Sequence, residues 1–376
     1  MTATAHAYFS ASKAPRWMRC PGSLSFDDAP VTSHAALEGK AAHELAAWCL
    51  ETGLDASEWP HAGIAIDDTD IAVGDEMVAA VATYVRMCRK HAAGALGFGV
   101  EQRVDYSDAI GQPDSFGTAD FLAINGSELV VADFKYGDET PIKAEDNEQL
   151  QLYALGALNL YGLVHAIDRI RLIISQPRLR HKSEWCTTPG ALRQFAEIAR
   201  ARAHQALQPD AATAFLNPGE TQCRYCPART SCPALVNDVL ATVAGDFDLA
   251  ALLPKLDMIE DWCDAVRERA RRTILEGGTI AGFKLVPGRR SVRAWSSASE
   301  AEAVLRSMRL RQEEMYDLSL ISPPAAERLL KDSPKRWARL VPLISQREGL
   351  PVVVRDDALS VDKPAVVAEP AEAAWI

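Results

Sequence analysis

The feature that most constrains the fold is a pair of apolar segments joined by a tight turn in the middle of the chain. Residues 117–124 and 128–135 have the pattern of β-strands, and Asn125-Gly126 lies between them. Asn-Gly is typical of two-residue hairpin turns, because both central positions of a type I′ turn need positive φ. The sequence therefore predicts an antiparallel hairpin whose register is set by this turn.

This register predicts which side chains share a face of the hairpin. With Asn125-Gly126 as the turn, Asp120 pairs with Val131. Side chains alternate along a strand, so Asp133 lies on the same face as Val131. Asp120 and Asp133 are then diagonal neighbours, roughly 7–8 Å apart at the backbone. Two carboxylates at this separation can reach one divalent cation, and Lys135 lies one step further along the strand.

Two acids and a lysine on one face of an otherwise apolar hairpin indicate a metal site. Residues 130–135 begin as an apolar strand, where an unpaired charge is costly. Carboxylate oxygens suit Mg²⁺ or Mn²⁺, and such an ion can activate water and stabilise a phosphoryl transition state. The residues by themselves also fit an Asp–Lys ion pair near a strand end, and they leave both interpretations open.

The segments around the hairpin predict an α/β fold, a small mixed β-sheet flanked by helices. Helices are expected at 33–52, 75–93, 145–161 and 189–207, strands at 98–106 and 169–176, and a loop at 55–74. After residue 238 the pattern becomes mainly helical, with a helical segment at 249–275 and a short β-ribbon at 283–295. At 376 residues the chain exceeds what one core usually organises. We therefore expect domains at 1–238 and 239–365, followed by a flexible tail at 366–376.

Charge and hydropathy exclude some classes of protein. The net charge of −11 argues against a generally basic nucleic-acid coat, although a nuclease can make its phosphate contacts locally. Charged residues interrupt every apolar run that might span a bilayer, and no signal peptide is visible at the start. We expect a cytoplasmic protein with no membrane partner.

The eight cysteines divide into one group and four isolated residues. Three lie close together in the sequence, and an early cysteine is the natural fourth member: Cys223, Cys226, Cys232 and Cys20. The isolated ones are expected to be small buried hydrophobic residues: Cys49, Cys88, Cys186 and Cys263. Four thiolates can hold Zn²⁺ or a [4Fe-4S] cluster equally well on ligand count, so the residues leave the metal open.

The order of these motifs resembles that of the RecB-like nucleases of the PD-(D/E)XK superfamily. Gly117-Thr118-Ala119-Asp120 followed by Asp133-Phe134-Lys135 is similar to the nuclease signature. His43, on an expected helix ahead of the sheet, resembles the RecB-type histidine motif. Gln149 and Tyr153, four residues apart and so on one helix face, resemble the Gln-x-x-x-Tyr motif. The resemblance covers roughly residues 8–235 and implies a restriction-endonuclease-like core.

The resemblance also implies roles for these residues. The metal would be held by His43, Asp120, Asp133 and the carbonyl of Phe134. Lys135 would orient or help activate the attacking water, Gln149 and Tyr153 would position the substrate strand or the lysine, and Glu101 would support the site from outside the ligand set. The cysteine spacing resembles that of iron–sulfur RecB-like nucleases, including CRISPR-associated exonucleases. It implies a [4Fe-4S] cluster on Cys20, Cys223, Cys226 and Cys232 that fastens the N-terminal segment to the end of the domain.

The whole chain is also similar to a family of phage and prophage proteins, in residues 17–23, 38–39 and 282–290. This implies a DNA exonuclease of phage replication or recombination, with single-strand-binding or recombination proteins as partners. A nuclease that trims DNA ends in CRISPR adaptation, a non-catalytic DNA-end-binding module and an RNA substrate are the alternatives. In the C-terminal region, Arg289, Arg290, Arg293 and Trp295 could contact phosphate and stack on a base, or form a solvated basic ribbon.

Overall fold

The computed structural model describes residues 7–26, 33–137, 140–244, 252–288, 293–295, 297–316, 320–345 and 349–355. The chain divides into two compact units, Met1–Trp262 and Cys263–Ile376. The first unit thus continues past residue 238, where the sequence placed the domain boundary. The predicted tail, residues 366–376, lies outside the described residues.

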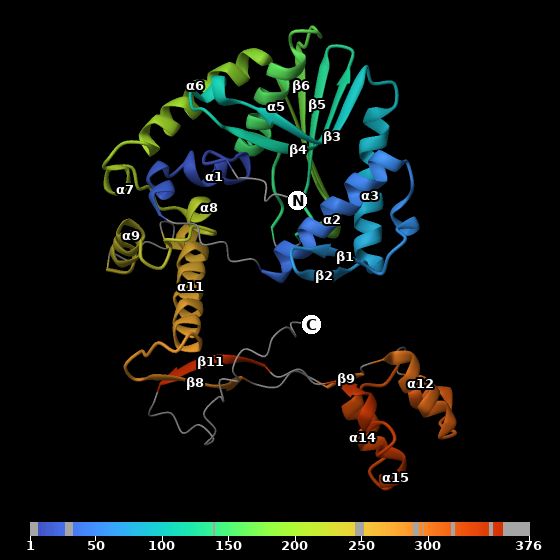
Figure 1. The fold of residues 1–376 in the computed structure, drawn as a ribbon. Helices are drawn as coiled ribbons and strands as arrows, with labels where there is room; N and C mark the ends of the chain where they lie inside the picture. The colour runs from blue at the N-terminus through green and yellow to red at the C-terminus, as the bar shows by residue number, and fades with distance from the viewer. Residues whose placement is uncertain are drawn as a thin grey trace. The chain divides into compact units, whose positions relative to one another are not determined.

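The first unit is built on a five-stranded mixed β-sheet (Figure 1). Its strand order is β3-β4-β5-β6-β7, in which β5 and β6 run parallel and the other neighbours antiparallel. The strands are β3 Gly97–Asp105, β4 Phe116–Asn125, β5 Glu128–Phe134, β6 Arg169–Gln176 and β7 His181–Thr187. The predicted α/β fold with a mixed sheet flanked by helices is confirmed.

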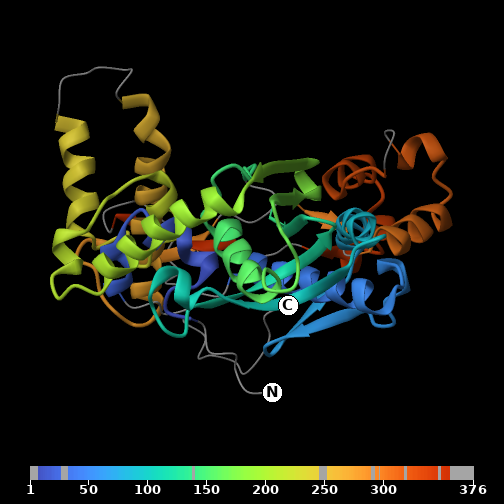
Figure 2. The ribbon, with the colours of Figure 1, turned by 90° about the horizontal axis from the view of Figure 1, so that it is seen from above.

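Helices cover both faces of this sheet. One face, called here the α5 face, packs against α5 (Glu148–Tyr161) and α6 (Pro189–Ala206). The opposite face, the α2 face, packs against α2 (His34–Thr52) and α3 (Asp75–Ala92). In the view from above, α3 is seen nearly end-on (Figure 2). Helix α5 connects β5 to β6, since parallel neighbours need a long crossover.

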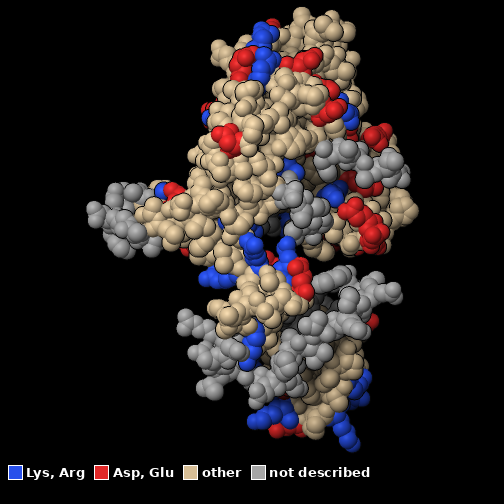
Figure 3. All heavy atoms as spheres, turned by 60° about the vertical axis from the view of Figure 1, so that its left-hand side comes forward, with Lys and Arg blue, Asp and Glu red and all other residues tan. Residues whose placement is uncertain are grey.

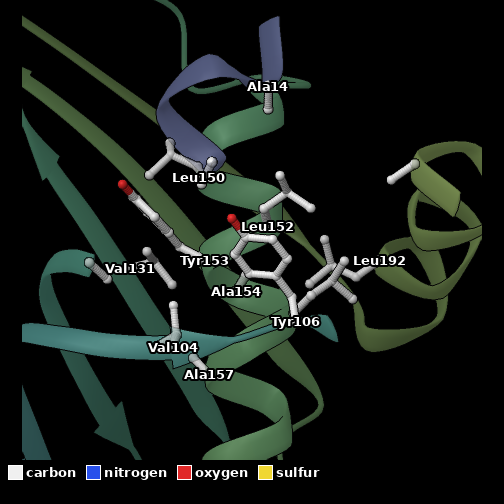
Figure 4. Close-up of a cluster of buried hydrophobic side chains, with 14 of the residues drawn as sticks. Ala14, Val104, Tyr106, Val131, Leu150, Leu152, Tyr153, Ala154, Ala157 and Leu192 are labelled. Carbon is white, nitrogen blue, oxygen red and sulfur yellow. The ribbon is translucent and has the colours of Figure 1, made fainter. Parts of the chain in front are cut away.

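The close packing of α5 on the sheet depends on Gly156. Figure 4 shows α5 side chains lying against Val104 and Val131 of the strands. A Cβ at Gly156 would meet Val104 Cβ at 2.8 Å. We therefore expect Gly156→Ala to lower the free energy of unfolding by about 1–3 kcal/mol in urea denaturation. Gly39 in α2 has nothing within 4 Å of its Cβ position. Gly39→Ala is the matched control and should be neutral or stabilising by up to about 1 kcal/mol; equal losses in both variants would contradict this packing.

Smaller elements complete the first unit. They are η1 Ala11–Lys13, α1 Ala14–Trp17, η2 Pro21–Ser25, η3 Ala56–Glu58, β1 Gly63–Ile66, β2 Thr69–Ala72, α4 Ser107–Ile110, η4 Pro177–Leu179, α7 Ala211–Ala214, α8 Glu220–Cys223 and α9 Pro233–Ala244. The loop predicted at 55–74 is wrong in part, because β1 and β2 form a hairpin there. Ile64 pairs with Ile71, and both are buried in the core of the α2 face.

Helix α11 (Leu256–Leu275), preceded by η5 (Leu253–Lys255), crosses the boundary between the units. In the second unit β8 (Phe283–Gly288) pairs with β11 (Gly349–Arg355), and β9 (Ala294–Trp295) with β10 (Ile344–Ser345). The predicted local ribbon at 283–295 is therefore wrong, because each strand finds its partner far along the chain. The remaining elements are α12 Ala298–Ser307, α13 Gln312–Met315, α14 Pro323–Leu329, α15 Pro334–Trp337 and η6 Val341–Leu343. Among the described helices, none combines the length and the apolarity needed to cross a membrane.

Candidate metal centre and cysteine group

The turn between β4 and β5 lies one residue later than the sequence predicted. Asn125 pairs with Glu128, so the loop residues are Gly126 and Ser127. The side-chain amide of Asn125 donates a hydrogen bond to the His91 carbonyl at 3.1 Å, which ties this residue to the end of α3. Gly126 has φ 62, which fits a type II′ turn with glycine at its first central position.

The corrected turn moves the register by two residues. Leu122, not Asp120, lies opposite Val131, and the ladder ends at the pair Phe121–Ala132. The next positions on the two strands are Asp120 and Asp133. The two aspartates therefore follow the last paired residues as direct neighbours, instead of lying diagonally.

Strand β4 also changes face at Asp120. Ala119 packs in the core of the α5 face, whereas Phe121 packs in the core of the α2 face. Residues two apart in a regular strand share a face, so the backbone is irregular between them. On β3, Glu101 has φ 46, and both Glu101 and Asp120 are skipped in the β3–β4 ladder. Such unusual backbone geometry is often found at functional sites.

Three ligand atoms gather at this irregularity. His43 Nδ1 of α2 lies 3.3 Å from Asp120 Oδ1 and 3.9 Å from Glu101 Oε1. All three atoms lie within 4.8 Å of one another. The other Asp120 oxygen accepts the backbone N–H of Phe134 at 2.6 Å, which fixes the carboxylate across the gap between the strands. One imidazole nitrogen and two carboxylates form a suitable donor set for a divalent cation.

Gln149 links the other predicted site residues into one network. Its amide oxygen accepts a hydrogen bond from Lys135 Nζ at 3.0 Å. Its amide nitrogen donates to Asp133 Oδ1 at 2.9 Å and to the Tyr153 hydroxyl at 3.0 Å. Gln149 and Tyr153 lie one turn apart on α5, and both are buried. The helix thereby holds the lysine and the second aspartate in one arrangement.

Asp133 has one carboxylate oxygen that lacks a hydrogen-bond donor. Lys135 Nζ lies 2.9 Å from Oδ2, which makes an ion pair by distance. Apart from this ion pair, Oδ2 is buried without a hydrogen-bond partner among the described residues. A buried acceptor left in this state costs free energy. Asp133 is outside the group of three candidate ligands, but its Oδ2 lies in the same site beside the Lys135 ammonium.

The charges of these groups strongly influence one another. Burial alone would lower the pKa of His43, but the negative charge of Asp120 and hydrogen bonds to the acids raise it to about 10. Burial works to raise the pKa of Asp120, and the His43 charge outweighs it, so this pKa is lowered. Burial raises the pKa of Asp133 to about 6, against the opposing charge of Lys135. Without a metal, the ionised form of Asp133 is therefore disfavoured by its burial.

The raised pKa of Asp133 predicts a dependence of stability on pH. A carboxyl with a folded-state pKa above its unfolded value stabilises the fold only at low pH, and this contribution is lost as the pH rises from 3.8 through about 6. In metal-free protein, Asp133→Asn should therefore be more stable than the wild type at pH 7, by about 1–3 kcal/mol. The advantage should shrink as the pH falls to about 4. Urea denaturation in chelator measures both values, and a variant that is less stable than the wild type at pH 7 would contradict this account of Asp133.

The four grouped cysteines come together in the first unit. Cys226 and Cys232 are buried in one small core with half-buried Cys223 beside them. Cys20 joins them from far along the chain, close enough for Cys226 and Cys232 to act on its thiol. The Asn217 N–H donates a hydrogen bond to its Sγ at 3.2 Å. Burial raises the pKa of Cys20, and the neighbouring Cys226 and Cys232 raise it further.

Two features of this group favour bound thiolates. The Gly219 N–H points at Cys223 Sγ at 3.4 Å, as the Asn217 N–H does at Cys20. Burial raises the pKa of the Cys226 thiol, while the buried Arg16 guanidinium beside it acts in the opposite direction. All eight cysteines are free of disulfide bonds. The group therefore has N–H donors and a cation placed to stabilise negative sulfur.

Other site predictions have mixed outcomes. Cys49 and Cys88 are buried as predicted, but Cys186 is exposed on the outer strand β7 and Cys263 is only half-buried. Phe134 stacks on Tyr84 and donates its N–H to Asp120, and the ligand role of its carbonyl stays a prediction.

In the second unit, two of the residues predicted to contact phosphate or a base already have partners within the protein. Arg293 pairs with Glu327, and the Trp295 indole donates to the Ile321 carbonyl, so both have internal partners. Arg289 and Arg290 lie outside the described residues.

The sequence predicts only a supporting role for one residue near the site and no role for another. Glu101 belongs to the ligand group itself, whereas the sequence placed it outside. The signal for it is a non-glycine residue at positive φ, which only the backbone shows. Arg178 lies over the ring of Tyr136, directly after Lys135, and nothing in its sequence context marks it.

The chain belongs to the family described as a protein of unknown function (DUF2800), whose model matches residues 6–359. The match spans both compact units. Membership of this family does not itself assign an activity, so the function is argued from the site.

Proposed function

We propose that the chain is a divalent-metal-dependent deoxyribonuclease of the RecB-like type, with a restriction-endonuclease-like core. The observation that carries this proposal is the convergence of three acidic groups, a histidine and a lysine where β4 and β5 cease to pair. His43, Glu101 and Asp120 offer three close ligand atoms, and Asp133 and Lys135 lie beside them. An isolated Asp–Lys ion pair would need neither the histidine nor the other two acids.

The donor set fits Mg²⁺ or Mn²⁺. His43, Glu101 and Asp120 would hold the ion, and the unsatisfied Asp133 Oδ2 is available as a further ligand. When bound, the ion neutralises phosphate charge and makes water a better nucleophile. Its binding requires His43 to lose the proton that the neighbouring acids stabilise, so affinity should rise with pH.

The chain's own residues position the remaining groups for phosphodiester hydrolysis. Lys135 keeps its positive charge because Asp133 and Asp120 raise its pKa against the effect of burial. Gln149 and Asp133 hold its ammonium in place, which readies it to stabilise charge developing on a phosphate oxygen. Tyr153 orients Gln149 by accepting its N–H.

The cysteine group supports a second proposal, a [4Fe-4S] cluster held by Cys20, Cys223, Cys226 and Cys232. Buried sulfurs near N–H donors and a cation suit a thiolate-bound cluster, and a single Zn²⁺ is the alternative. Such a group would join the N-terminal segment to the end of the first unit. Its role would then be to close a long loop of the chain.

In its cellular role the enzyme would act as an exonuclease in phage DNA replication or recombination, together with single-strand-binding or recombination proteins. The test is purification without oxygen, followed by digestion of end-labelled DNA and RNA with and without Mn²⁺. The proposal predicts metal-dependent shortening of DNA and little effect on RNA. Binding of DNA without any product would indicate a non-catalytic module and would refute the enzyme assignment.

A further inference from the structure

A groove of about 620 Å³ lies beside the candidate metal centre in the first unit. One wall is α3, which presents Ala79, Ala80 and Met87 together with the polar Thr83 and the acidic Glu76. The opposite wall is the connection from β6 to β7, which presents Arg178, Arg180, His181 and Lys182 together. The groove thus has a mixed side, with apolar residues and one acid that pairs with Arg178, and a cationic side.

The strand register places this groove next to the metal centre. Asp133 of β5 pairs with Ile174 of β6, and Phe134 pairs with Ser175, which lines the groove. The next strand continues the row, because Ser175 pairs with Lys182 of β7. The Lys135 N–H also donates to the Ser175 carbonyl at 2.9 Å. At the backbone the groove therefore begins on the strand next to Asp133 and Lys135, and its lining residues are separate from the three candidate ligands.

The cationic side chains of the groove differ in whether they form ion pairs with acidic residues. Arg178 pairs with Glu76 and lies over Tyr136, and Lys182 pairs with Glu184. Arg180 is exposed, and none of the described residues forms an ion pair or hydrogen bond with its guanidinium. Its backbone has φ 51, a left-handed conformation that is uncommon outside glycine, at the turn between η4 and β7. This unpaired charge is the one most available to a ligand.

The cationic wall of the groove suits an anionic occupant. On the face drawn in Figure 3, basic and acidic side chains are interspersed, so the protein offers no broad basic field there. The net charge of −11 would repel a polyanion that lacks a local contact. One phosphodiester backbone with its sugars and bases is an occupant of this kind. Phosphates fit the cationic wall, and bases and sugars fit the apolar residues of the other wall.

We propose that this groove binds a single strand of DNA and leads it to the metal centre, with Arg180 contacting a phosphate. The proposal rests on the nuclease function and names its substrate as a single strand. It assigns the path of that strand across β6 and β7, on the side of α3.

The test is equilibrium binding of a fluorescent oligothymidylate to the full protein without added divalent metal. Arg180→Asn removes the charge, and asparagine tolerates the left-handed backbone. Thr83→Glu places a negative charge on the α3 wall of the groove. Each variant should bind about tenfold more weakly at low salt. Arg180→Asn should also reduce the slope of log K against log salt by about 0.7, the share of one phosphate contact.

The matched control is Arg193→Asn, which removes an exposed arginine on α6, across the sheet from the groove. It should bind as the wild type does. Wild-type affinity in both groove variants, or equal competition by a blunt duplex of the same length, would overturn the proposal. The nuclease function is tested separately by Mn²⁺-dependent cleavage, so its failure would leave the binding result interpretable.

Discussion

Lys135→Ala is expected to reduce Mn²⁺-dependent DNA cleavage by at least about a thousandfold. The ammonium is held by Asp133 and Gln149 at 2.9 and 3.0 Å, so it is fixed before the substrate arrives. A fixed cation that meets developing charge needs no reorganisation during the reaction, and its loss falls mainly on kcat. Initial rates on an end-labelled oligonucleotide, at saturating substrate, measure the effect.

Asp120→Asn should cause a loss of similar size for a different reason. It removes the carboxylate that contacts both His43 and the Phe134 N–H, so Mn²⁺ binding itself should weaken. Lys135→Ala should retain Mn²⁺ binding, and calorimetry distinguishes the two variants.

The control for both losses is Arg193→Ala, which changes an exposed arginine on α6, across the sheet from the groove. It should keep wild-type rates. Circular dichroism must show that all three variants are folded. Cleavage by folded Lys135→Ala at the wild-type rate would remove the lysine from the mechanism.

Cys226→Ser is expected to abolish the bound metal group and to destabilise the first unit by about 2–5 kcal/mol. Cys226 is buried in the small core that also holds Cys232, and its loss leaves three thiols around the site. A cluster that joins Cys20 to residues some two hundred positions later closes a long loop, and such closure restricts the unfolded chain.

Three measurements check the cysteine prediction. Anaerobically purified wild type should contain about four iron atoms per chain and absorb broadly in the visible range, and Cys226→Ser should lose both. Urea denaturation should show the loss of stability. Cys186→Ser, which changes an exposed cysteine on β7, is the control and should keep the iron and the stability. One zinc and no iron in the wild type would reject the cluster in favour of the zinc alternative.

Much of the fold follows from local signals in the sequence. Helix α2 begins after Ser33, whose hydroxyl accepts the Ala36 N–H, and ends at Gly53 with φ 78. These are a cap and a stop signal that residue identity alone reveals. The existence of the hairpin strands, α3 and α6 is predicted equally well, because each has a strong periodic pattern between clear breaks, but the register of the hairpin is not.

The details that build the site are less visible in the sequence. The observed turn lies one residue later than the predicted one, because Asn125 is held by a tertiary hydrogen bond to the His91 carbonyl. The change of face at Asp120 and the positive φ of Glu101 break the period-two rule on which the sequence argument depended. Strand β7 was not predicted, because its residues alternate between exposed and half-buried positions with no apolar run.

The most direct test of the central claim is a crystal structure of the protein with Mn²⁺, using anomalous scattering to locate the ion. We predict a strong peak about 2.0–2.3 Å from His43 Nδ1 and from oxygens of Glu101 and Asp120, with Asp133 turned toward it. The protein in these crystals must still cleave DNA. An ion bound elsewhere, or no ion at these three side chains at saturating Mn²⁺, would contradict the assignment of this centre.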